Sequence, residues 1–479
     1  MLTQEENEIL TRVGPGTPGG ELMRRYWHPI STSVQMGPIS VRQVRILCED
    51  LVLYRDRRGE LGLIGDRCIH RAFKMKYGVP EEDGLRCPYH GWLYNAEGQC
   101  TEMPLEPPTS GFKDKIQIKG YPVQEMGGLV WAYLGPDPVP VLPKWDLFVR
   151  PGYRAMVGHQ LPCNWLQVAE NRADLGHAIY LHGRLFQFAM EQQGLLTDNP
   201  DTFYNSQVRA QDDRLARGVY PRWRPVYNQF GLAKGRLDSD KSEDSPSWNI
   251  GSNPILFPYH LMFGPNSPYS MRRMYQIGVP IDDEHTWHIA YHCWTFPEEV
   301  GVPAQDSVSY TEAAIFTEDG DAIRDYVLSQ DMIAWWGQGE LTDRTKEHLG
   351  ISDTVVIAYR KLLKQQIQTV MEGGEPINVF RDEASAWRPE LRIPGMNDPI
   401  EIAGQYQTNI RGALKPGEKP IQSSRTDPLY LAKYDKMTFT EQEEKWLPEA
   451  EKELVLGLYT KTEEYYRQRL ADAAMAPAG

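Results

Sequence analysis

The sequence lacks any uninterrupted apolar run long enough to cross a bilayer, which takes about 20 residues. Its opening residues, 1–8, are acidic and carry no cationic segment followed by an apolar one, so they do not resemble a secretory signal. Acidic residues outnumber basic ones by 65 to 51, and phosphate binding requires clustered cations. These absences predict a soluble, cytoplasmic protein with neither a membrane nor a nucleic acid as partner.

Cysteine is also scarce, with 6 in the chain. Four of them are scattered along the chain without a paired spacing: Cys48, Cys100, Cys163 and Cys293. Such scattering is typical of buried thiols in a reducing compartment rather than of a disulfide framework. No Gly-x-Gly-x-x-Gly fingerprint occurs in a strand-to-helix context, so the chain is not expected to bind a dinucleotide itself. No repeat of solenoid period is present either.

At 479 residues the chain is long enough for two or three domains. From Val41 to about Pro136, short apolar runs alternate with turns, and hairpins are predicted around 56–59 and around 127–128. The proline-rich stretch 136–143 cannot continue a sheet or a helix interior. It is therefore the predicted domain boundary.

Beyond this boundary helical patterns alternate with strands. Strands are predicted over 255–263 and 273–296, the latter with a turn at 281–285. The predicted helices cover 164–182, 321–336, 354–371 and, after a turn-rich part that begins near 382, about 440–469. The pattern indicates an α+β chain, with an all-β part followed by a part that mixes sheet and helix.

Two short runs carry the most specific signal: Cys68-Ile69-His70 and the segment 87–92, which reads CPYHGW. A Rieske [2Fe–2S] centre needs two cysteines on one iron and two histidines on the other. A structural zinc site also takes two of each, but zinc fingers usually pair like with like in each knuckle. Because Cys68 is here paired with His70, and Cys87 with His90, the spacing favours the iron–sulfur cluster.

A second constellation lies in the predicted helix 164–182. Asp174 and His177 share a helix face, whereas His182 lies five positions after His177, roughly 140° around an ideal helix. The two imidazoles can meet one ion only if the helix ends or distorts near Ile179. Two neutral imidazoles and one carboxylate form the facial triad of non-haem Fe(II) oxygenases. Two histidines alone are weak evidence, but an upstream Rieske motif supplies the electron source that such an iron needs.

With these motifs the chain resembles the oxygenase (α) subunit of the Rieske non-haem iron oxygenases, in the phthalate 4,5-dioxygenase-like branch that also includes 5,5′-dehydrodivanillate O-demethylase. The resemblance runs from residue 9 to about Leu363 and depends on both knuckles and on 170–177, which reads ENRADLGH. Ile69 departs from the family, which usually has proline there; the ligands stay intact and only the stiffness of the loop is affected. The part after about 382 is longer than the branch implies.

The resemblance implies a role for each site residue. The implied cluster ligands are Cys68, His70, Cys87 and His90, and the implied iron ligands are His177, His182 and, from far downstream, Asp331. Asp325 and Asp343 are nearby alternatives for the third iron ligand. Asp174 is implied to be an electron bridge, hydrogen-bonded to His177 and to His90 of a neighbouring subunit. One subunit's cluster would then serve the next subunit's iron, in a homotrimer or a dimer of trimers.

The resemblance also implies four segments: a helical N-terminal segment packing on the catalytic domain (1–40), an all-β Rieske domain (41–143), a catalytic domain of helix-grip fold, an antiparallel sheet with helices (144–381), and a C-terminal extension with a helix (382–479). The implied activity is oxidation of an aromatic carboxylic acid by O₂. The electrons come from NAD(P)H through a separate reductase, either simple or fused to a ferredoxin.

Three outcomes stay open at this point. The opening segment and the long C-terminal part favour O-demethylation of a methoxylated, lignin-derived acid with release of formaldehyde. The alternative reaction is cis-dihydroxylation of a phthalate or benzoate. The alternative class is a Rieske electron carrier without catalysis, which would not need a second domain of this size.

Two groups of residues are candidates for binding the substrate. Five arginines lie close together in one short stretch, and arginine suits bidentate capture of a carboxylate. The interleaved Asp212 and Asp213 are equally typical of a solvated face. The five are Arg209, Arg214, Arg217, Arg222 and Arg224. Four aromatic residues either line a ring-binding pocket or fill the core: Phe186, Phe188, Tyr204 and Trp223.

Overall fold

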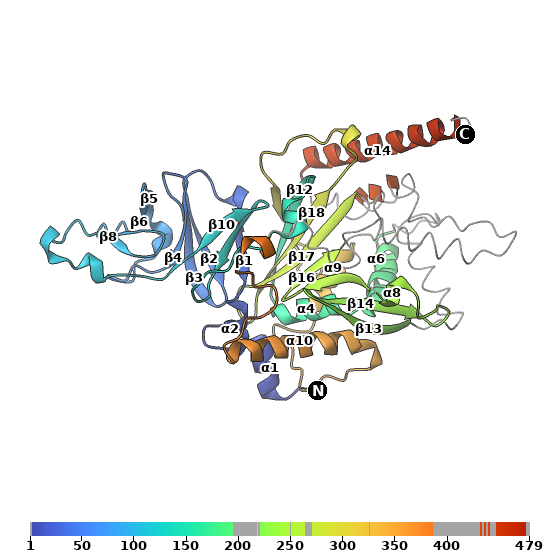
Figure 1. Cartoon of the computed structure of the whole chain (residues 1–479), viewed down its shortest axis with the longest axis horizontal. Coiled ribbons are helices and arrows are strands. Elements are labelled where there is room, and N and C mark those ends of the chain that lie inside the picture. Colours follow the sequence, from blue (N-terminus) through green and yellow to red (C-terminus); the bar gives the residue numbers. More distant parts are fainter. Residues whose placement is uncertain are drawn as a thin grey trace.

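An all-β region and a larger sheet-and-helix region follow one another along the chain and lie at opposite ends of the molecule (Figure 1). The computed structural model describes residues 2–194, 218, 221–249, 251–263, 271–324, 326–386, 432–433, 435–436, 439–440 and 447–475. The predicted α+β class is confirmed.

The N-terminal region holds three small antiparallel sheets, ordered β1-β11-β10, β2-β3-β4-β9 and β5-β6-β7-β8. Both predicted hairpins are present, and Gly127 and Gly128 turn the second with φ of 63° and 78°, which favour glycine. The strands are β1 (Trp27–Thr32), β2 (Ser40–Ile46), β3 (Glu49–Arg55), β4 (Leu61–Gly65), β5 (Val79–Glu81), β6 (Gly84–Arg86), β7 (Leu93–Tyr94), β8 (Cys100–Glu102), β9 (Gly120–Tyr121), β10 (Val123–Met126) and β11 (Leu129–Tyr133).

The segment 1–40 differs from its predicted helical character. Only α1 (Gln4–Thr11) and α2 (Pro18–Met23) are α-helical, and Trp27–Thr32 forms strand β1 beside β11. Every residue of β1 is buried, so pairing with β11 satisfies backbone groups that water cannot reach. Helices α1 and α2 do pack on the sheet-and-helix region, and the side chain of Asn164 there donates to the carbonyl of Thr11 at 3.0 Å.

The second region is built on an eight-stranded sheet ordered β13-β14-β15-β16-β17-β18-β12-β19, antiparallel except between β12 and β19. The strands are β12 (Tyr153–Leu161), β13 (Pro221–Asn228), β14 (Gly231–Asp238), β15 (Ser252–Leu256), β16 (His260–Phe263), β17 (Arg272–Pro280), β18 (Thr286–Trp294) and β19 (Ser309–Glu312). The helices are α3 (Asp146–Val149), α4 (Trp165–Ala173), α5 (His177–Ile179), the π-helix η5 (Tyr180–Leu185), α6 (Phe186–Gln192), α8 (Pro246–Asn249), α9 (Val327–Trp336), α10 (Thr354–Met371), α11 (Glu383–Ala386) and α14 (Glu449–Met475).

The two faces of this sheet have different partners. On one face, the hydroxyl of Tyr291 donates to the carbonyl of Gly127 in the N-terminal region at 2.8 Å. On the other face, α4 comes so close to β17 that a Cβ on Gly278 would lie 3.1 Å from the guanidinium of Arg172. Helix α9 covers the same face, where the rings of His288 and Trp335 are 5.0 Å apart. The helical face therefore carries the elements that build the second site.

Most predicted elements are present, with four differences in extent. Helix α10 and the β17–β18 hairpin lie where expected, but Pro258 and its neighbours break the predicted strand 255–263 into β15 and β16. Helix α9 begins only at Val327, and the predicted helix 164–182 is interrupted after Ala173. The last helix, α14, begins at Glu449 instead of near residue 440, and it packs on the end of the sheet through a cluster that includes Trp294, Phe439 and Tyr459. The domain boundaries given above stay predictions.

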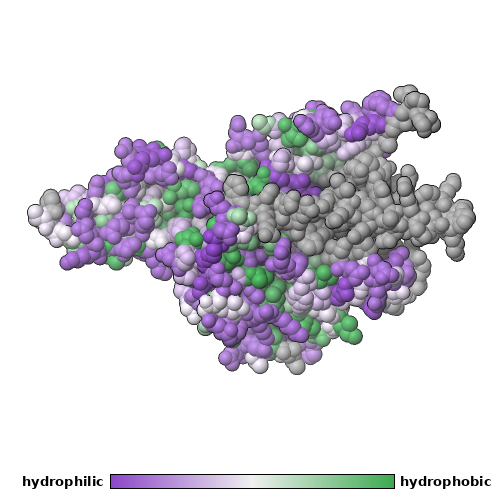
Figure 2. All heavy atoms as spheres, in the orientation of Figure 1, coloured by the Kyte–Doolittle hydropathy of each residue, from purple (hydrophilic) through white to green (hydrophobic). Residues whose placement is uncertain are grey.

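The described helices include none that is long and apolar enough to span a membrane. In Figure 2 the surface over the N-terminal strands is predominantly hydrophilic, with apolar residues in small separate patches.

A buried ion network anchors α4. The carboxylate of Glu170 lies 2.8 Å from Arg344 Nη2 and 2.6 Å from Arg360 Nε, and these three side chains are at most 10% exposed. Burial alone would raise the pKa of Glu170, but the two guanidinium groups outweigh it and lower the pKa. Arg344 also donates to Asn7 of α1, so the network ties α4 to α10, to the segment after α9 and to the N-terminus.

We expect Glu170→Gln to destabilise the protein by about 3–5 kcal/mol, because it leaves two buried guanidinium groups without their shared counter-ion. Urea denaturation followed by tryptophan fluorescence measures the loss. The control is Asp343→Asn, which removes an exposed pair with Lys346 and should leave the midpoint unchanged. Equal midpoints for Glu170→Gln and wild type would contradict the structural role of the network.

Candidate metal centres

The first candidate centre lies on two loops of the N-terminal region, one after β4 and one between β6 and β7. Each loop is a tight turn: the amide of Ala72 donates to the carbonyl of Cys68, and the amide of Gly91 to the carbonyl of Cys87, both at 2.9 Å. The turns point both cysteines inward, where each is 2% exposed, and leave His70 exposed and His90 half-buried. The histidine side of the centre thus faces outward.

The donor geometry separates a binuclear cluster from a zinc ion. Four ligands on one zinc bring their donor atoms within about 4 Å of one another, because each bond is about 2.0–2.3 Å long. Within the described part of the chain, three donor atoms of this kind gather within 4.8 Å only at His177, His182 and Asp331. At the first centre the rings of His70 and His90 are 4.5 Å apart, and the buried thiols of Cys68 and Cys87 are neighbours. These residues fit a Rieske cluster, in which two cysteines hold one iron and two histidines hold the other.

Two further side chains contact the first centre. The ring of Trp92 stacks on His70 with centroids 4.5 Å apart, and the hydroxyl of Tyr94 lies 3.2 Å from the sulfur of Cys68. Burial and the neighbouring Cys68 thiol raise the pKa of Cys87. Because a metal binds the thiolate, binding a cluster here must release protons. The Tyr94 contact is also of the kind that adjusts a cluster's potential, since hydrogen bonds to the sulfurs contribute to it.

The second candidate centre depends on a break in the predicted helix. Helix α4 ends at Ala173, and the carboxylate of Asp174 accepts from the amides of Gly176 at 2.7 Å and His177 at 3.1 Å. The chain then makes one helical turn and the π-helix η5, in which the hydrogen bonds span five residues instead of four. This wider winding is the distortion near Ile179 that the His177–His182 spacing requires, and it places the two rings 5.1 Å apart.

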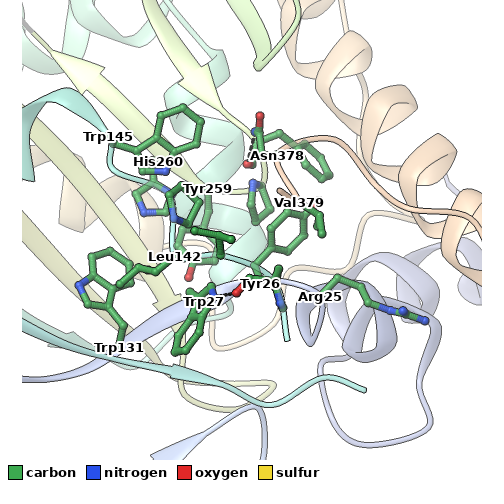
Figure 3. Close-up of a pocket in the computed structure, with 15 residues that line it drawn as sticks. Arg25, Tyr26, Trp27, Trp131, Leu142, Trp145, Tyr259, His260, Asn378 and Val379 are labelled. Atoms are coloured by element: carbon green, nitrogen blue, oxygen red, sulfur yellow. Dashed lines mark hydrogen bonds between the residues drawn. The ribbon is translucent and has the colours of Figure 1, made fainter. Parts of the chain in front are cut away.

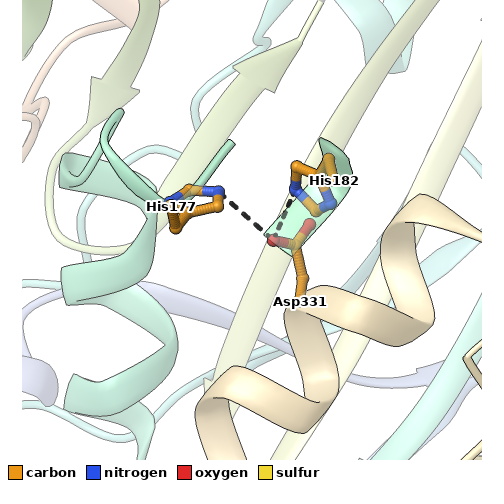
Figure 4. Close-up of side chains that lie close together, drawn as sticks. All are labelled: His177, His182 and Asp331. Carbon is orange, nitrogen blue, oxygen red and sulfur yellow. Dashed lines mark ion pairs between the residues drawn. The ribbon is translucent and has the colours of Figure 1, made fainter. Parts of the chain in front are cut away.

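Asp331, on α9, completes this group (Figure 4). Its Oδ1 lies 3.4 Å from His177 Nε2 and 3.1 Å from His182 Nε2. That oxygen is buried and accepts no hydrogen bond from the described residues. A carboxylate oxygen and two imidazole nitrogens that converge without a donor fit a divalent cation.

The far nitrogens of both rings have acceptors. His177 Nδ1 lies 3.1 Å from the carboxylate of Asp174, and His182 Nδ1 lies 3.0 Å from the amide oxygen of Gln330. Both contacts turn the Nε2 lone pair toward Asp331. The sequence indicated Asp174, but Gln330 was missed; its only signal is that it directly precedes Asp331.

Electrostatics in the absence of a metal agree with this picture. Burial lowers the pKa of His177, but the neighbouring carboxylates of Asp174 and Asp331 outweigh it and raise the pKa to about 9. The pKa of Asp331 is held far below its usual range by His182 and His177, against the opposing effect of burial. The metal-free site therefore attracts a proton, and a bound cation would take that proton's place.

The two alternative third ligands do not join the site. Asp343 is exposed and accepts from Thr345 and Lys346, at 2.5 Å and 2.9 Å. Asp325 lies outside the described residues.

Of the residues considered for substrate binding, those that the structure describes lie on α6 and β13. Arg222 and Arg224 lie on the edge strand β13, stack on Trp248 and pair with Glu243 and Asn249, as expected of the solvated-face alternative. Phe186 and Trp223 are buried and Phe188 is half exposed. The remaining candidates, Arg209, Arg214, Arg217 and Tyr204, lie outside the described residues.

A cavity of about 30 Å³ lies elsewhere, between the segment 25–27, the linker 140–143 and the loop before β16 (Figure 3). Its lining includes Trp27, Trp145 and His260. This volume suits a water or two, whereas small-molecule pockets span roughly 300–1,000 Å³. It is therefore a packing gap at the junction of the two regions and not a substrate site.

Comparisons with known families agree with both centres. Residues 26–122 match the Rieske [2Fe-2S] domain, a range that begins before the predicted start at 41 and includes β1. Residues 161–369 match the vanillate O-demethylase oxygenase C-terminal domain. The two matches together contain all four cysteine and histidine residues of the first centre and all three residues of the second.

Individual relatives cover most of the chain. It is 37% identical to the 5,5′-dehydrodivanillate O-demethylase oxygenase subunit of Sphingobium sp., over 80% of this chain and 85% of that protein. It is 30% identical to the phthalate 4,5-dioxygenase oxygenase subunit of Pseudomonas putida, over 79% of this chain and 89% of that protein. Among solved structures, the terminal oxygenase of carbazole 1,9a-dioxygenase from Novosphingobium sp. KA1 matches with a TM-score of 0.50 and 20% identity, over 75% of this chain and 94% of that one, a likeness of fold.

Since the similarity extends over four fifths of the chain and includes both metal-binding motifs, this protein belongs to the Rieske non-haem iron oxygenases, as a terminal oxygenase subunit whose cofactors are a [2Fe–2S] cluster and a mononuclear iron.

Proposed function

We propose that this oxygenase O-demethylates a methoxylated aromatic acid of the kind derived from lignin. The observation that carries the proposal is the 37% identity to an O-demethylase oxygenase subunit across most of both chains, joined to a match of the catalytic region with a second O-demethylase family. The proposal is reached through the relatives, because the metal ligands are the same for demethylation and for ring dihydroxylation. Which carbon is oxidised depends on the part of the substrate that is held near the iron.

The proposed reaction balances as follows. One atom of O₂ enters a C–H bond of the methoxy group, and the other leaves as water with two electrons and two protons. The resulting hemiacetal breaks its carbon–oxygen bond to the ring oxygen and releases formaldehyde and a phenol. NAD(P)H supplies the electrons through a separate reductase.

We assign the two metal sites to the side chains described above. Cys68, His70, Cys87 and His90 hold the cluster, and His177, His182 and Asp331 hold the iron. When bound, the iron supplies oxygen activation and the cluster supplies single electrons. The residues of the chain hold the ligands in their binding tautomers and present one buried carboxylate to balance charge.

Asp174 is proposed as the link between the two centres. One oxygen of its carboxylate accepts from His177 Nδ1, and the side chain is still 26% exposed, so it can accept another hydrogen bond from outside the chain. The cluster loops and α9 belong to regions at opposite ends of one chain (Figure 1). We therefore propose that the outward-facing His90 of a neighbouring subunit meets Asp174, in a trimer or a dimer of trimers.

Removing the third ligand should empty the iron site and spare the cluster. Wild type should contain about three irons per chain, two of them in the cluster. For Asp331→Asn we expect about two irons per chain, an unchanged Rieske visible spectrum and turnover lowered at least about 100-fold, because two imidazoles alone hold iron weakly. Metal analysis and optical spectra on one sample check this. Retention of the third iron would refute the assignment of Asp331.

Replacing the bridge should separate binding from electron transfer. Asp174→Asn keeps the size of the side chain and removes its charge, so both metals should stay bound while turnover falls about 100-fold, the upper end for a residue that supports a metal ligand. Rapid mixing of the reduced protein with substrate and O₂ follows re-oxidation of the cluster. Near-normal re-oxidation in this variant would show that electrons take another route.

Product analysis tests the proposed reaction directly. With a reductase and NADH supplied, phthalates, benzoates and methoxylated biaryl acids are screened for formaldehyde and for diol. We expect formaldehyde in a 1:1 ratio to NADH consumed with a methoxylated acid, because each demethylation takes two electrons. A diol without formaldehyde would establish the dihydroxylation alternative instead.

A further inference from the structure

We propose that Gln330 is a positioning residue that fixes the tautomer and the orientation of His182. The inference rests on the proposed iron site and concerns a residue that is not one of its ligands. Gln330 is completely buried on α9, and its Oε1 lies 3.0 Å from His182 Nδ1.

The direction of the amide group follows from its second hydrogen bond. Gln330 Nε2 donates to the backbone carbonyl of Arg324 at 3.0 Å, and a carbonyl can only accept. The amide nitrogen is therefore turned toward Arg324 and the amide oxygen toward the ring. Since that oxygen can only accept, the proton of neutral His182 lies on Nδ1, and the lone pair of Nε2 faces Asp331 Oδ1 at 3.1 Å.

Helix α9 thus faces His182 at both ring nitrogens. Consecutive residues on an α-helix point about 100° apart, so Gln330 and Asp331 reach the ring from different directions. Asp331 faces the Nε2 lone pair across the proposed metal position and makes no hydrogen bond to the ring. The hydrogen bond from Nδ1 to Gln330 is therefore the contact that fixes how the His182 ring is turned.

The two histidines are supported in chemically different ways. His177 donates to a carboxylate, whereas His182 donates to a neutral amide. A carboxylate raises the basicity of the imidazole that donates to it more than an amide does. Gln330 therefore orients His182 without adding a third negative charge to a site that already contains Asp174 and Asp331.

Anaerobic titration with ferrous iron tests the role without relying on turnover. Gln330→Met keeps the length of the side chain but offers no strong acceptor, so iron should bind about 10–100-fold more weakly, and the EPR spectrum of the ferrous site treated with nitric oxide should change. Gln330→Glu keeps an acceptor at the ring and should bind iron within about threefold of wild type. The matched control is Gln338→Met, at an exposed glutamine just beyond α9, which should change neither affinity nor spectrum.

Folding is followed in the same samples by the Rieske spectrum. If Gln330→Met does not fold, Gln330→Asn replaces it, because the side chain that is one methylene shorter withdraws the oxygen from the ring and should also weaken binding. Wild-type affinity and spectrum in Gln330→Met, or in Gln330→Asn where that variant replaces it, would overturn the inference. So would equal weakening in Gln330→Glu, which would indicate that the bond to Arg324 matters and the contact with His182 does not. A wild-type chain that binds no ferrous iron beyond the cluster would instead overturn the proposed iron site.

Discussion

The convergence of three acceptors around a buried point, two imidazole nitrogens and one oxygen of Asp331, constrains the whole catalytic region. Such an arrangement is unfavourable unless a proton or a metal cation lies between the three groups, because each is partly desolvated and each offers a lone pair. Helices α4 and α9 must therefore be held rigidly. The Glu170 network with Arg344 and Arg360 does this for α4, at a position four residues before Asp174. Glu170, which anchors α4, and Asp174, which contacts the ring of His177, therefore lie in the same short segment.

The two centres differ in how they are exposed. The cluster loops bury their sulfurs and present their histidines outward, whereas in the second centre Asp331 is buried, His177 and His182 are half-buried, and the neighbouring Asp174 is partly exposed. In the electron route proposed above, Asp174 is the polar contact between the outward histidines and the iron ligands. The two regions lie at opposite ends of the molecule (Figure 1), which is why the proposal takes the cluster from a neighbouring subunit.

Local patterns in the sequence were enough for some elements. The apolar stripe of α10 coincides with the helix, and the glycine pair at 127–128 turns its hairpin as predicted. The break after Ala173 could not be read from the apolar periodicity, because it is made by polar contacts: the carboxylate of Asp174 accepts from the amides of Gly176 and His177. The contact of His182 on η5 with Gln330 on α9 joins residues more than 140 positions apart. Likewise the packing of α14 against Trp294 joins residues far apart in the chain, which no local pattern could predict.

In the candidate sites, too, local patterns in the sequence predicted some residues, whereas others could be recognised only from contacts between distant parts of the chain. The mixed Cys–His knuckles define their chemistry in the sequence itself, since residue type and spacing are local. Asp331 was indicated by family resemblance and not by spacing, because several acidic residues stand near it in the chain. Gln330 was not predicted, since a glutamine beside an acidic residue has no distinctive pattern. Its role becomes visible only when His182 lies 3.0 Å away.

The measurement that most directly tests cooperation between centres on different chains is complementation. One chain would carry Cys87→Ser and keep its iron site, and the other Asp331→Asn and keep its cluster; each alone should be inactive. Co-assembled in equal amounts, they should recover about a quarter of wild-type turnover, because in a random ring one contact in four joins an intact cluster to an intact iron site. Mixed oligomers no more active than the separate variants would contradict electron transfer between neighbouring subunits.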